Sequence, residues 1–319
     1  MTVEVSVIIP TRDRPSTLRW ALRSVADQDV DGVELLVAND GRTDVSSIAA
    51  EFGARVVPHE PGRGPSAARN AAIEQARGRY TAFLDDDDLY LDGHLRAALD
   101  RLESGADLVY TSAVVAPRRV RPGAIDLTGF PVAFDLPLRP EFLGVTNFIA
   151  ASAVACRDVR AIGARFDEDL RVEEDWDMWQ RLVIGHGYRI AHLNRPAVVY
   201  HRIADVPSAT TAVLGDVEVH RMFFDAYRTI TTRWPVRAGS PAARYRDWMR
   251  YVYRLVFDRL ESGRPPHLHW YERCLRVLFD AFTGAAPEAR LPGALAEAVD
   301  AEGPGSRYGH QSQEGQPQR

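Results

Sequence analysis

Lysine is absent from this chain of 319 residues, and all 39 of its basic side chains are arginine. This absence excludes a lysine nucleophile, a Schiff-base lysine and the lysine of a P-loop, so guanidinium groups or a metal ion must neutralise any bound anion. Cysteine is nearly absent as well, because Cys156 and Cys274 lie far apart and outside any Cys/His cluster. We therefore expect neither a disulfide framework nor a zinc site, and a reducing, cytoplasmic setting fits best.

Long apolar runs are also missing. No stretch reaches the length of about 18 apolar residues that a membrane span needs, and the N-terminus lacks the basic lead of a secretory signal. We expect neither export nor a transmembrane segment. Hydrophobic residues nevertheless make up 45% of the chain, which is enough to form a substantial core.

The formal net charge of -5 is unevenly distributed along the chain. Residues 1–210 contain 31 acidic side chains and 24 arginines, whereas residues 211–300 contain 11 and 13. Such a chain is not expected to bind nucleic acid. We expect a catalytic domain over residues 1–205, a helical extension over residues 206–300 and a polar, disordered tail over residues 301–319.

Short apolar runs alternate with helical stretches over the first hundred residues, which is typical of an α/β fold with a mostly parallel sheet covered by helices. We expect strands at 3–10, 33–38, 54–58 and 80–84, and helices at 16–27, 44–52 and 66–76. Ser16 is the expected N-cap of the first of these helices, and in one of two interpretations of the loop before the third helix Ser66 is its cap.

The middle of the chain mixes strands and helices around a loop rich in proline and glycine at 116–140. We expect strands at 107–115, 148–156, 189–193 and 197–201, and helices at 92–103 and 174–184. Only helices are expected after about residue 216. In the helix predicted at 241–263, an apolar stripe that includes Tyr245 and Met249 faces one way and arginines face the other.

Polar residues follow three of the predicted strands, at 10–13, 39–41 and 85–88. Sheets of this kind bind ligands beyond the carboxyl ends of their strands. The polar residues therefore lie where this architecture places a site.

Four consecutive carboxylates, Asp85 to Asp88, follow a predicted buried strand. A divalent cation relieves their mutual repulsion, and oxygen ligands select Mg²⁺ or Mn²⁺, ions that keep coordination positions for substrate phosphates. Because side chains alternate along an extended chain, Asp85 and Asp87 point the same way, so that one can contact a ribose while the other binds metal. The alternative is a solvated acidic loop that caps a helix near Asp92.

Residues 39–41, Asn-Asp-Gly, form either an Asx turn or a base-binding site. A carboxylate here can accept the N3–H of uracil or thymine, whereas cytosine has no such donor. The segment 62–70 is a loop that enters a helix. Either its backbone amides and Arg69 face a nucleotide, or it is an ordinary loop capped by Ser66.

Residues 173–177, Glu-Glu-Asp-Trp-Asp, begin a predicted helix. Acidic side chains in a first turn can simply complement the helix dipole. The functional alternative is that one of them, in the first place Asp175, takes the proton of an attacking hydroxyl as general base. His201 follows an apolar strand and is by itself either a structural histidine or a ligand.

Taken in order, four segments resemble glycosyltransferase family 2, the inverting transferases with a GT-A fold. They are VSVIIPTRDRPSTLRWALRSV, LLVANDGRTD, GPSAARNAAIEQARGRYTAFLDDDD and FDEDLRVEEDWDMWQRL, within about residues 3–202. The resemblance implies a Rossmann-like, mostly parallel sheet between helices, a nucleotide-diphospho-sugar donor, a Mn²⁺ or Mg²⁺ ion, and attack by an acceptor hydroxyl with inversion at the anomeric carbon. We expect transfer of a single sugar, with a UDP- or dTDP-sugar favoured.

The resemblance also implies roles for individual residues. Asp175 is the expected general base, Asp87 the first metal ligand, and Asp85 a ligand of ribose or metal. His201 resembles a histidine that in some members helps to hold metal or diphosphate. The residues expected in the nucleotide-sugar site are Pro10, Thr11, Arg14, Asp40, Arg69, Asp85, Asp86 and Glu174.

Three departures from the family's pattern leave the donor open. Asn39 stands where aspartate is common, Arg42 where serine is common, and Gly-Ala-Arg-Phe at 163–166 replaces a more usual G-G-F. These departures do not affect the expected mechanism, because the carboxylates that carry it are present.

Two other functions compete with sugar transfer. The first is a nucleotide-sugar-binding protein that has lost transfer and acts through its helical part; the second is a nucleotidyltransferase, which would need a lysine-rich triphosphate loop. The segment 206–300 could pack on the catalytic domain or on a dimer partner, bind the acceptor, or lie on an anionic membrane at its inner face. The expected partners are the donor and a hydroxyl-bearing glycan, glycolipid or small metabolite.

Overall fold

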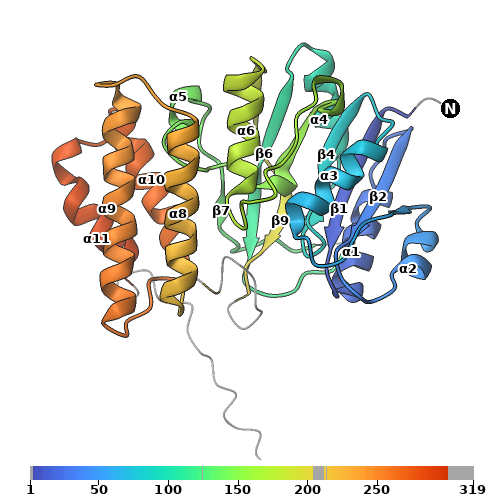
Figure 1. The fold of residues 1–319 in the computed structure, drawn as a ribbon, viewed down its shortest axis with the longest axis horizontal. Coiled ribbons are helices and arrows are strands. Elements are labelled where there is room, and N and C mark those ends of the chain that lie inside the picture. Colours follow the sequence, from blue (N-terminus) through green and yellow to red (C-terminus); the bar gives the residue numbers. More distant parts are fainter. Residues whose placement is uncertain (1–2, 124, 204–211, 213, 301–319) are drawn as a thin grey trace, which may run out of the picture.

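The computed structural model describes residues 3–123, 125–203, 212 and 214–300, so the predicted disordered tail and the predicted boundary between residues 205 and 206 lie outside the described residues. Figure 1 shows a mixed α/β part that contains the N-terminus and, beside it, a layer of helices formed by the C-terminal part. No helix in the described ranges is long and apolar enough to cross a bilayer.

The predicted α/β fold is confirmed. Within the described residues, one sheet of nine strands has the order β3-β2-β1-β4-β8-β6-β9-β5, and β7 pairs with β6. The pairs β3-β2, β2-β1, β1-β4 and β6-β9 are parallel, and the other pairs are antiparallel. The strands are β1 (Val5–Thr11), β2 (Val33–Asn39), β3 (Arg55–Val57), β4 (Tyr80–Phe83), β5 (Leu89–Tyr90), β6 (Leu108–Ala116), β7 (Val132–Ala133), β8 (Val154–Arg157) and β9 (Ile190–His201).

Helices cover both faces of the sheet and form the C-terminal layer (Figure 1). They are α1 (Pro15–Ala26), α2 (Ser46–Glu51), α3 (Pro65–Gln75), α4 (His94–Glu103), α5 (Pro140–Leu143), α6 (Glu174–Gln180), α8 (Val217–Arg233), α9 (Pro241–Glu261), α10 (Trp270–Phe282) and α11 (Leu291–Val299). Because side chains alternate along a strand, Ile8 of β1 packs with α3 and α6 on one face, while Val7 and Ile9 pack with α1, α2 and α4 on the other.

The predicted strand ends hold to within a few residues in the first half of the chain, but both predicted N-caps are wrong. Arg14 and Gly64 precede α1 and α3, and no side chain caps either helix. In each case a proline, Pro15 or Pro65, occupies the first helical position, since its fixed φ suits a helix start. Each helix therefore begins one residue before the predicted serine cap.

Two strand predictions in the middle of the chain need correction. The strand expected at 148–156 is limited to β8, because residues 148–153 form a loop and one 3-10 turn (Ala151–Ala153) that is buried without strand pairing. The strands expected at 189–193 and 197–201 are one strand, β9, whose register against β6 shifts near Ser112. The helix expected to end at 184 finishes in a π-helical turn, Arg181–Gly185.

A single hydrophobic core joins the C-terminal helices to the sheet. Trp176 of α6 stacks on Tyr227 of α8 with ring centroids 5.5 Å apart, and Phe142 of α5 contacts Phe279 of α10 edge to face at 5.2 Å. All four side chains belong to the same buried cluster. Of the roles considered for residues 206–300, packing on the catalytic domain is therefore observed.

The predicted apolar stripe of α9 is buried at Tyr245 and Met249, but one arginine of this helix is buried too. Arg246 is 5% exposed and donates hydrogen bonds to the carbonyl oxygens of Gly144 at 2.6 Å, Thr231 at 3.0 Å and Trp234 at 2.7 Å. Carbonyls at the end of α8 lack helical partners, and a guanidinium satisfies several at once. The buried face of α9 therefore includes one charged side chain in addition to the apolar stripe.

Arg246→Met tests this interpretation, since methionine retains part of the aliphatic volume and removes every donor. We expect the free energy of unfolding to fall by about 3 kcal/mol, because three carbonyls lose a charged donor. Urea unfolding followed by circular dichroism measures the loss. Arg250→Met, on the exposed face of the same helix, should change stability by less than about 0.5 kcal/mol. Equal effects of the two substitutions would contradict the assigned role of Arg246.

Candidate active site

A cavity of about 380 Å³ lies at the carboxyl ends of β1, β2 and β4. The C-terminal helices bound it on the other side. Every residue expected in the site lines this cavity: Pro10, Thr11, Arg14, Asp40, Arg69, Asp85, Asp86, Asp87, Glu174, Asp175 and His201. The structure thus brings together two acidic segments that are separated by almost ninety residues of sequence.

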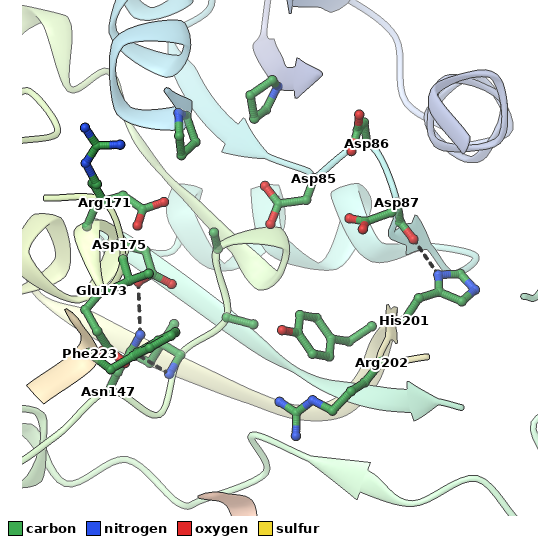
Figure 2. Close-up of a pocket in the computed structure, with 18 of the residues that line it drawn as sticks. Asp85, Asp86, Asp87, Asn147, Arg171, Glu173, Asp175, His201, Arg202 and Phe223 are labelled. Atoms are coloured by element: carbon green, nitrogen blue, oxygen red, sulfur yellow. Dashed lines mark hydrogen bonds between the residues drawn. The ribbon is translucent and has the colours of Figure 1, made fainter. Parts of the chain in front are cut away.

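The four consecutive carboxylates divide into two that face the cavity and two that are buried. Figure 2 shows the carboxylates of Asp85 and Asp87 directed into the cavity and that of Asp86 directed away from it. Asp86 is 1% exposed and accepts a hydrogen bond from Thr11 Oγ1 at 2.6 Å, and Asp88 is 2% exposed and accepts one from Ser152 Oγ at 2.6 Å. The predicted alternation is therefore observed.

The alternative of a helix-capping acidic loop is wrong. The residue before α4 is Gly93, and no side chain caps this helix. Asp86 and Asp88 instead connect this loop to β1 and to the turn before β8.

Burial raises the pKa of Asp86 to about 7 and also raises the pKa of Asp87. Arg14 offsets part of this cost, since its guanidinium is 3.3 Å from Asp86 and forms an ion pair with Asp87. Asp87 thus already has a cationic partner in Arg14. Its carboxylate oxygens are also hard ligands of the kind that Mg²⁺ and Mn²⁺ prefer. No three His, Cys, Asp or Glu side chains of the described chain form a metal-binding group, so a cation here would rely on substrate oxygens as well.

His201 does not have the free nitrogen that a metal ligand needs. Its Nδ1 lies 2.5 Å from the carbonyl oxygen of Asp87, and its Nε2 accepts a hydrogen bond from the Val120 amide at 3.0 Å. Burial lowers its pKa to about 4, so the ring is neutral at pH 7, with Nδ1 as the donor and Nε2 as the acceptor. The prediction of His201 as a metal ligand is not supported, because its interactions are those of a residue that positions the acidic loop.

Arg69 of α3 joins the two acidic segments. Its Nη1 donates to Glu174 Oε1 at 2.8 Å and its Nη2 donates to Asp85 Oδ1 at 2.6 Å. The residue is 3% exposed, and its guanidinium lies 5.3 Å from the centroid of the Phe166 ring. Arg69 was expected to face a nucleotide directly; in the structure it acts first as the bridge between carboxylates.

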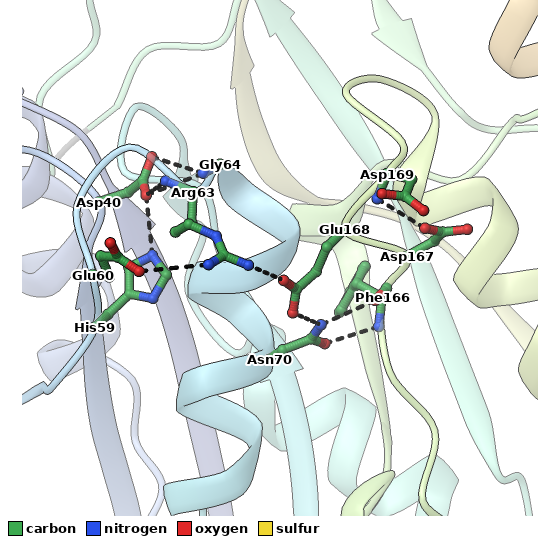
Figure 3. A network of polar contacts seen from close by, with 10 residues as sticks. All are labelled: Asp40, His59, Glu60, Arg63, Gly64, Asn70, Phe166, Asp167, Glu168 and Asp169. Atoms are coloured by element: carbon green, nitrogen blue, oxygen red, sulfur yellow. Dashed lines mark hydrogen bonds and ion pairs between the residues drawn. The ribbon is translucent and has the colours of Figure 1, made fainter.

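Asp40 closes the loop that leads into α3 (Figure 3). Its Oδ1 accepts hydrogen bonds from the amides of Arg63 at 2.8 Å and Gly64 at 3.1 Å, and lies 3.0 Å from His59 Nε2. The expected Asx turn also exists, but it is formed by Asn39, whose Oδ1 accepts from the Gly41 amide at 3.0 Å. Asp40 is thereby held at the rim of the cavity.

A second contact in Figure 3 fixes the segment that leads to α6. Asn70 of α3 donates through Nδ2 to the carbonyl of Phe166 at 3.0 Å and accepts from the Phe166 amide at 2.9 Å. The clamp holds the approach to the acidic residues 173–177 against α3, next to Arg69.

Asp175 lies at the start of α6 and lines the cavity. Its Oδ1 accepts hydrogen bonds from Asn147 Nδ2 at 3.0 Å and from its neighbour's amide, Trp176 N, at 2.8 Å. Burial, and then the charge of Glu174, raise its pKa to about 7. A carboxylate with such a pKa can accept a proton near neutral pH.

Asp177 of the same acidic run is structural. It is fully buried and accepts from Arg181, Arg233 and Trp234 Nε1 at 2.8 to 2.9 Å. Complementing the helix dipole therefore does not account for Asp177, because its hydrogen bonds connect α6 to the end of α8.

Sequence reasoning missed the residues that hold Asp175. Asn147 is oriented by the Ile149 amide, which donates to its Oδ1 at 3.2 Å, and Tyr271 of α10 donates to its carbonyl at 2.9 Å. The Tyr271 hydroxyl also lies 2.9 Å from Thr146 Oγ1. Nothing in the local sequence marks Asn147 or Tyr271, because Asn147 meets Asp175, and Tyr271 meets Asn147, only through tertiary packing.

Residues 6–160 match the family model described as Glycosyl transferase family 2. An uncharacterized glycosyltransferase of Bacillus subtilis (strain 168), YwdF, is 26% identical over 220 residues, which are 67% of this chain and 79% of the relative. The chain is thus similar to proteins named as glycosyltransferases over about two thirds of its length.

Two solved structures resemble the whole arrangement. Residues 1–349 of TarS from S. aureus in complex with UDP-GlcNAc have a TM-score of 0.54 and 16% identity, covering 94% of this chain and 83% of TarS 1–349. The mannosyltransferase PcManGT from Pyrobaculum calidifontis, in complex with GDP-Man and Mn²⁺, has a TM-score of 0.51 and 18% identity, covering 93% of this chain and 79% of that chain. At these identities the likeness shows the fold.

The contact between Asn147 and Asp175 predicts a measurable effect. The amide N–H stabilises the charged carboxylate, so Asn147→Ala should raise the apparent pKa of Asp175 further, by about one pH unit if the bond contributes about 1.5 kcal/mol. The carboxyl ¹³C shift of Asp175, followed by NMR against pH, measures it. Asn39→Ala, which removes an amide from a turn away from Asp175, is the control and should leave this pKa unchanged. A lowered pKa in Asn147→Ala would contradict the assigned hydrogen bond.

Proposed function

We propose that this chain, whose residues 6–160 match the Glycosyl transferase family 2 model, is a glycosyltransferase that moves a single sugar from a nucleotide-diphospho-sugar to an acceptor hydroxyl with inversion at the anomeric carbon. One observation carries the proposal: Asp85 and Asp87 of one segment share a cavity with Asp175 of another. Two carboxylates can serve the donor diphosphate while a third serves the acceptor. Arg69 lies between the two acidic segments, since it contacts Asp85 on one side and Glu174 on the other.

The nucleoside end of the donor binds, in this proposal, along Pro10, Thr11 and Asp40 at the ends of β1 and β2. Asp40 favours a uracil or thymine base, because its carboxylate can accept the N3–H of either ring. Most of its hydrogen bonds in the described chain use Oδ1. Its Oδ2 retains room for a further hydrogen bond. A UDP- or dTDP-sugar therefore fits better than a CDP-sugar.

The diphosphate end lies over Asp85 and Asp87, which would hold a Mn²⁺ or Mg²⁺ ion. When bound, such an ion supplies positive charge that stabilises the departing diphosphate. Carboxylate oxygens are the ligands that these ions prefer, and Arg14, which pairs with Asp87 in this structure, would have to share that carboxylate with the ion. Asp86, turned away, positions the loop through Thr11.

Asp175 receives the proton of the acceptor hydroxyl. As the hydroxyl oxygen bonds to the anomeric carbon, the bond from that carbon to the diphosphate oxygen breaks, and its electron pair leaves with the nucleoside diphosphate. The hydrogen bonds from Asn147 and Trp176 both use Oδ1 of Asp175, which leaves Oδ2 for the proton. A pKa near 7 suits this role, because the group is charged before the step and can hold the proton after it.

The C-terminal helices serve this cavity rather than a membrane or a second copy of the chain. In the described part of the chain, the exposed large hydrophobic side chains are Val132 and Ile184, and neither lies on α8 to α11. The apolar faces of these helices are already buried in the core that they share with α5 and α6. Peripheral contact with the inner face of a membrane and dimerisation through these helices therefore gain no support, and an acceptor-side role is preferred.

Asp175→Asn tests the assignment of the base. Since asparagine cannot take a proton, we expect turnover to fall by at least about 10², while affinity for the nucleoside diphosphate is retained. Turnover is measured as nucleoside diphosphate released from a panel of UDP- and dTDP-sugars with Mn²⁺ and saccharide acceptors, and affinity by calorimetry. The exposed Asp169→Asn is the control. Wild-type turnover in Asp175→Asn would remove Asp175 from the mechanism; nucleotide-sugar binding without any turnover in the wild type would favour a silent binding protein.

Asp87→Ala tests the cation site by binding alone. We expect the affinity for UDP to fall about tenfold or more when Mn²⁺ is present and to change little in EDTA, because the lost carboxylate acts through the ion. Calorimetry with UDP in both buffers gives the comparison, and exposed Asp92→Ala is the control. An equal loss of affinity with and without Mn²⁺ would mean that Asp87 is not a ligand.

A further inference from the structure

The wall of the cavity opposite the strand ends is aromatic. Its residues come from the C-terminal part of the chain and are Phe223 of α8, Tyr253 of α9, Leu268, and Trp270 and Tyr271 of α10. The rings of Trp270 and Tyr271 are 5.4 Å apart and nearly perpendicular, at 84°. Aromatic faces with a few polar groups among them are typical of sites for small ligands that have an apolar face.

One carboxylate oxygen beside this wall lacks a hydrogen-bond partner in the described chain. Oε2 of Glu173 is shielded from solvent and has no partner in the part of the chain that the structure describes. Glu173 also has a left-handed backbone, with φ of 60° and ψ of 16°, which is strained for a residue other than glycine. Figure 2 shows this residue between Asp175 and Phe223. A shielded carboxylate oxygen without a donor is costly, so a ligand that brings a donor gains affinity there.

The charges around Glu173 decide which kind of donor fits. Arg69 is paired with Glu174 and Asp85, and Arg202, which is 5% exposed, is paired with Glu272 of α10. The exposed Arg171 lines the rim, and its guanidinium points away from Glu173 (Figure 2). Each of these arginines is either paired or directed away from Glu173, so among the described residues no free cation lies beside Glu173 to meet a phosphate or carboxylate of the ligand.

We propose that this half of the cavity is the acceptor site, and that the acceptor is an uncharged or amino-bearing saccharide ring. The apolar face of the ring packs on Phe223 and Trp270, one hydroxyl reaches Asp175, and a second hydroxyl or an amino group donates to Glu173. The assignment rests on the proposed function, because it takes Asp175 as the base. It adds the chemical class of the acceptor and gives the C-terminal helices their role in choosing it.

Saturation-transfer NMR on the full chain with UDP and Mn²⁺ tests the site without requiring turnover. The probes are methyl glycosides of glucose, galactose and mannose, methyl glucosaminide, and glucose 6-phosphate. We expect transfer to the ring C–H protons of the neutral or amino glycosides and at least about tenfold weaker binding of the phosphate. Phe223→Ala should weaken binding of every glycoside, and Glu173→Gln should weaken binding of the amino glycoside most.

Two control variants separate the site from general damage. Phe224→Ala changes the next residue of α8, which packs on Tyr253 and Phe257 and does not line the cavity, and Glu141→Gln changes an exposed carboxylate. Both should leave glycoside binding unchanged. Wild-type glycoside binding in Phe223→Ala and in Glu173→Gln would overturn the proposed site.

The remaining outcomes distinguish this inference from the proposed function. If UDP binds and no glycoside does, or if glucose 6-phosphate binds best, the acceptor assignment is overturned and the donor assignment stands. If UDP fails to bind while the glycosides bind in a manner that depends on Phe223, the saccharide site stands and the proposed transfer fails.

Discussion

The guanidinium of Arg69 holds two carboxylates, from Asp85 and Glu174, on opposite sides of one buried cation. Carboxylates this close would repel one another, and removing either partner of a buried pair leaves an uncompensated charge. Lysine could not replace it, because a single ammonium lacks the two separated N–H arms of the planar fork. The spacing between Asp85 and the acidic residues at the start of α6 therefore depends on one side chain of α3.

The same constraint explains why the acidic residues divide into two groups. Asp86, Asp88 and Asp177 are buried, and each is matched by a hydroxyl, an amide or an arginine that ties one element to another. Asp85, Asp87 and Asp175 line the cavity together with Asp86, whose carboxylate is directed away from it. Part of the acidity of the first two-thirds of the chain is thus structural, and residues next to these structural carboxylates in the sequence line the cavity.

Sequence reasoning located the strand ends and the carboxylates of the cavity, because both follow from local patterns: apolar runs for β1, β2 and β4, and polar residues directly after them. It failed where tertiary contacts decide. Histidine is a common metal ligand, but Nε2 of His201 already accepts a hydrogen bond from the Val120 amide. The helical spacing places Arg246 on the exposed face, but its guanidinium is buried and donates to carbonyl oxygens at the end of α8. Asn147 and Tyr271 have no local signal at all.

The family match ends at residue 160, before Asp175 and before every helix of the C-terminal layer. The matched region contains the strand ends and the acidic loop, which are the donor half of the proposed site. The unmatched region contributes the aromatic wall and, through Tyr271, the contact that orients Asn147 and hence Asp175. Because α6 and α8 share one core, the aromatic wall and the position of Asp175 depend on the same packing, and so do the acceptor site and the base proposed for them. A change in these helices must therefore preserve the contact from Tyr271 to Asn147, or Asp175 loses the hydrogen bond that positions it.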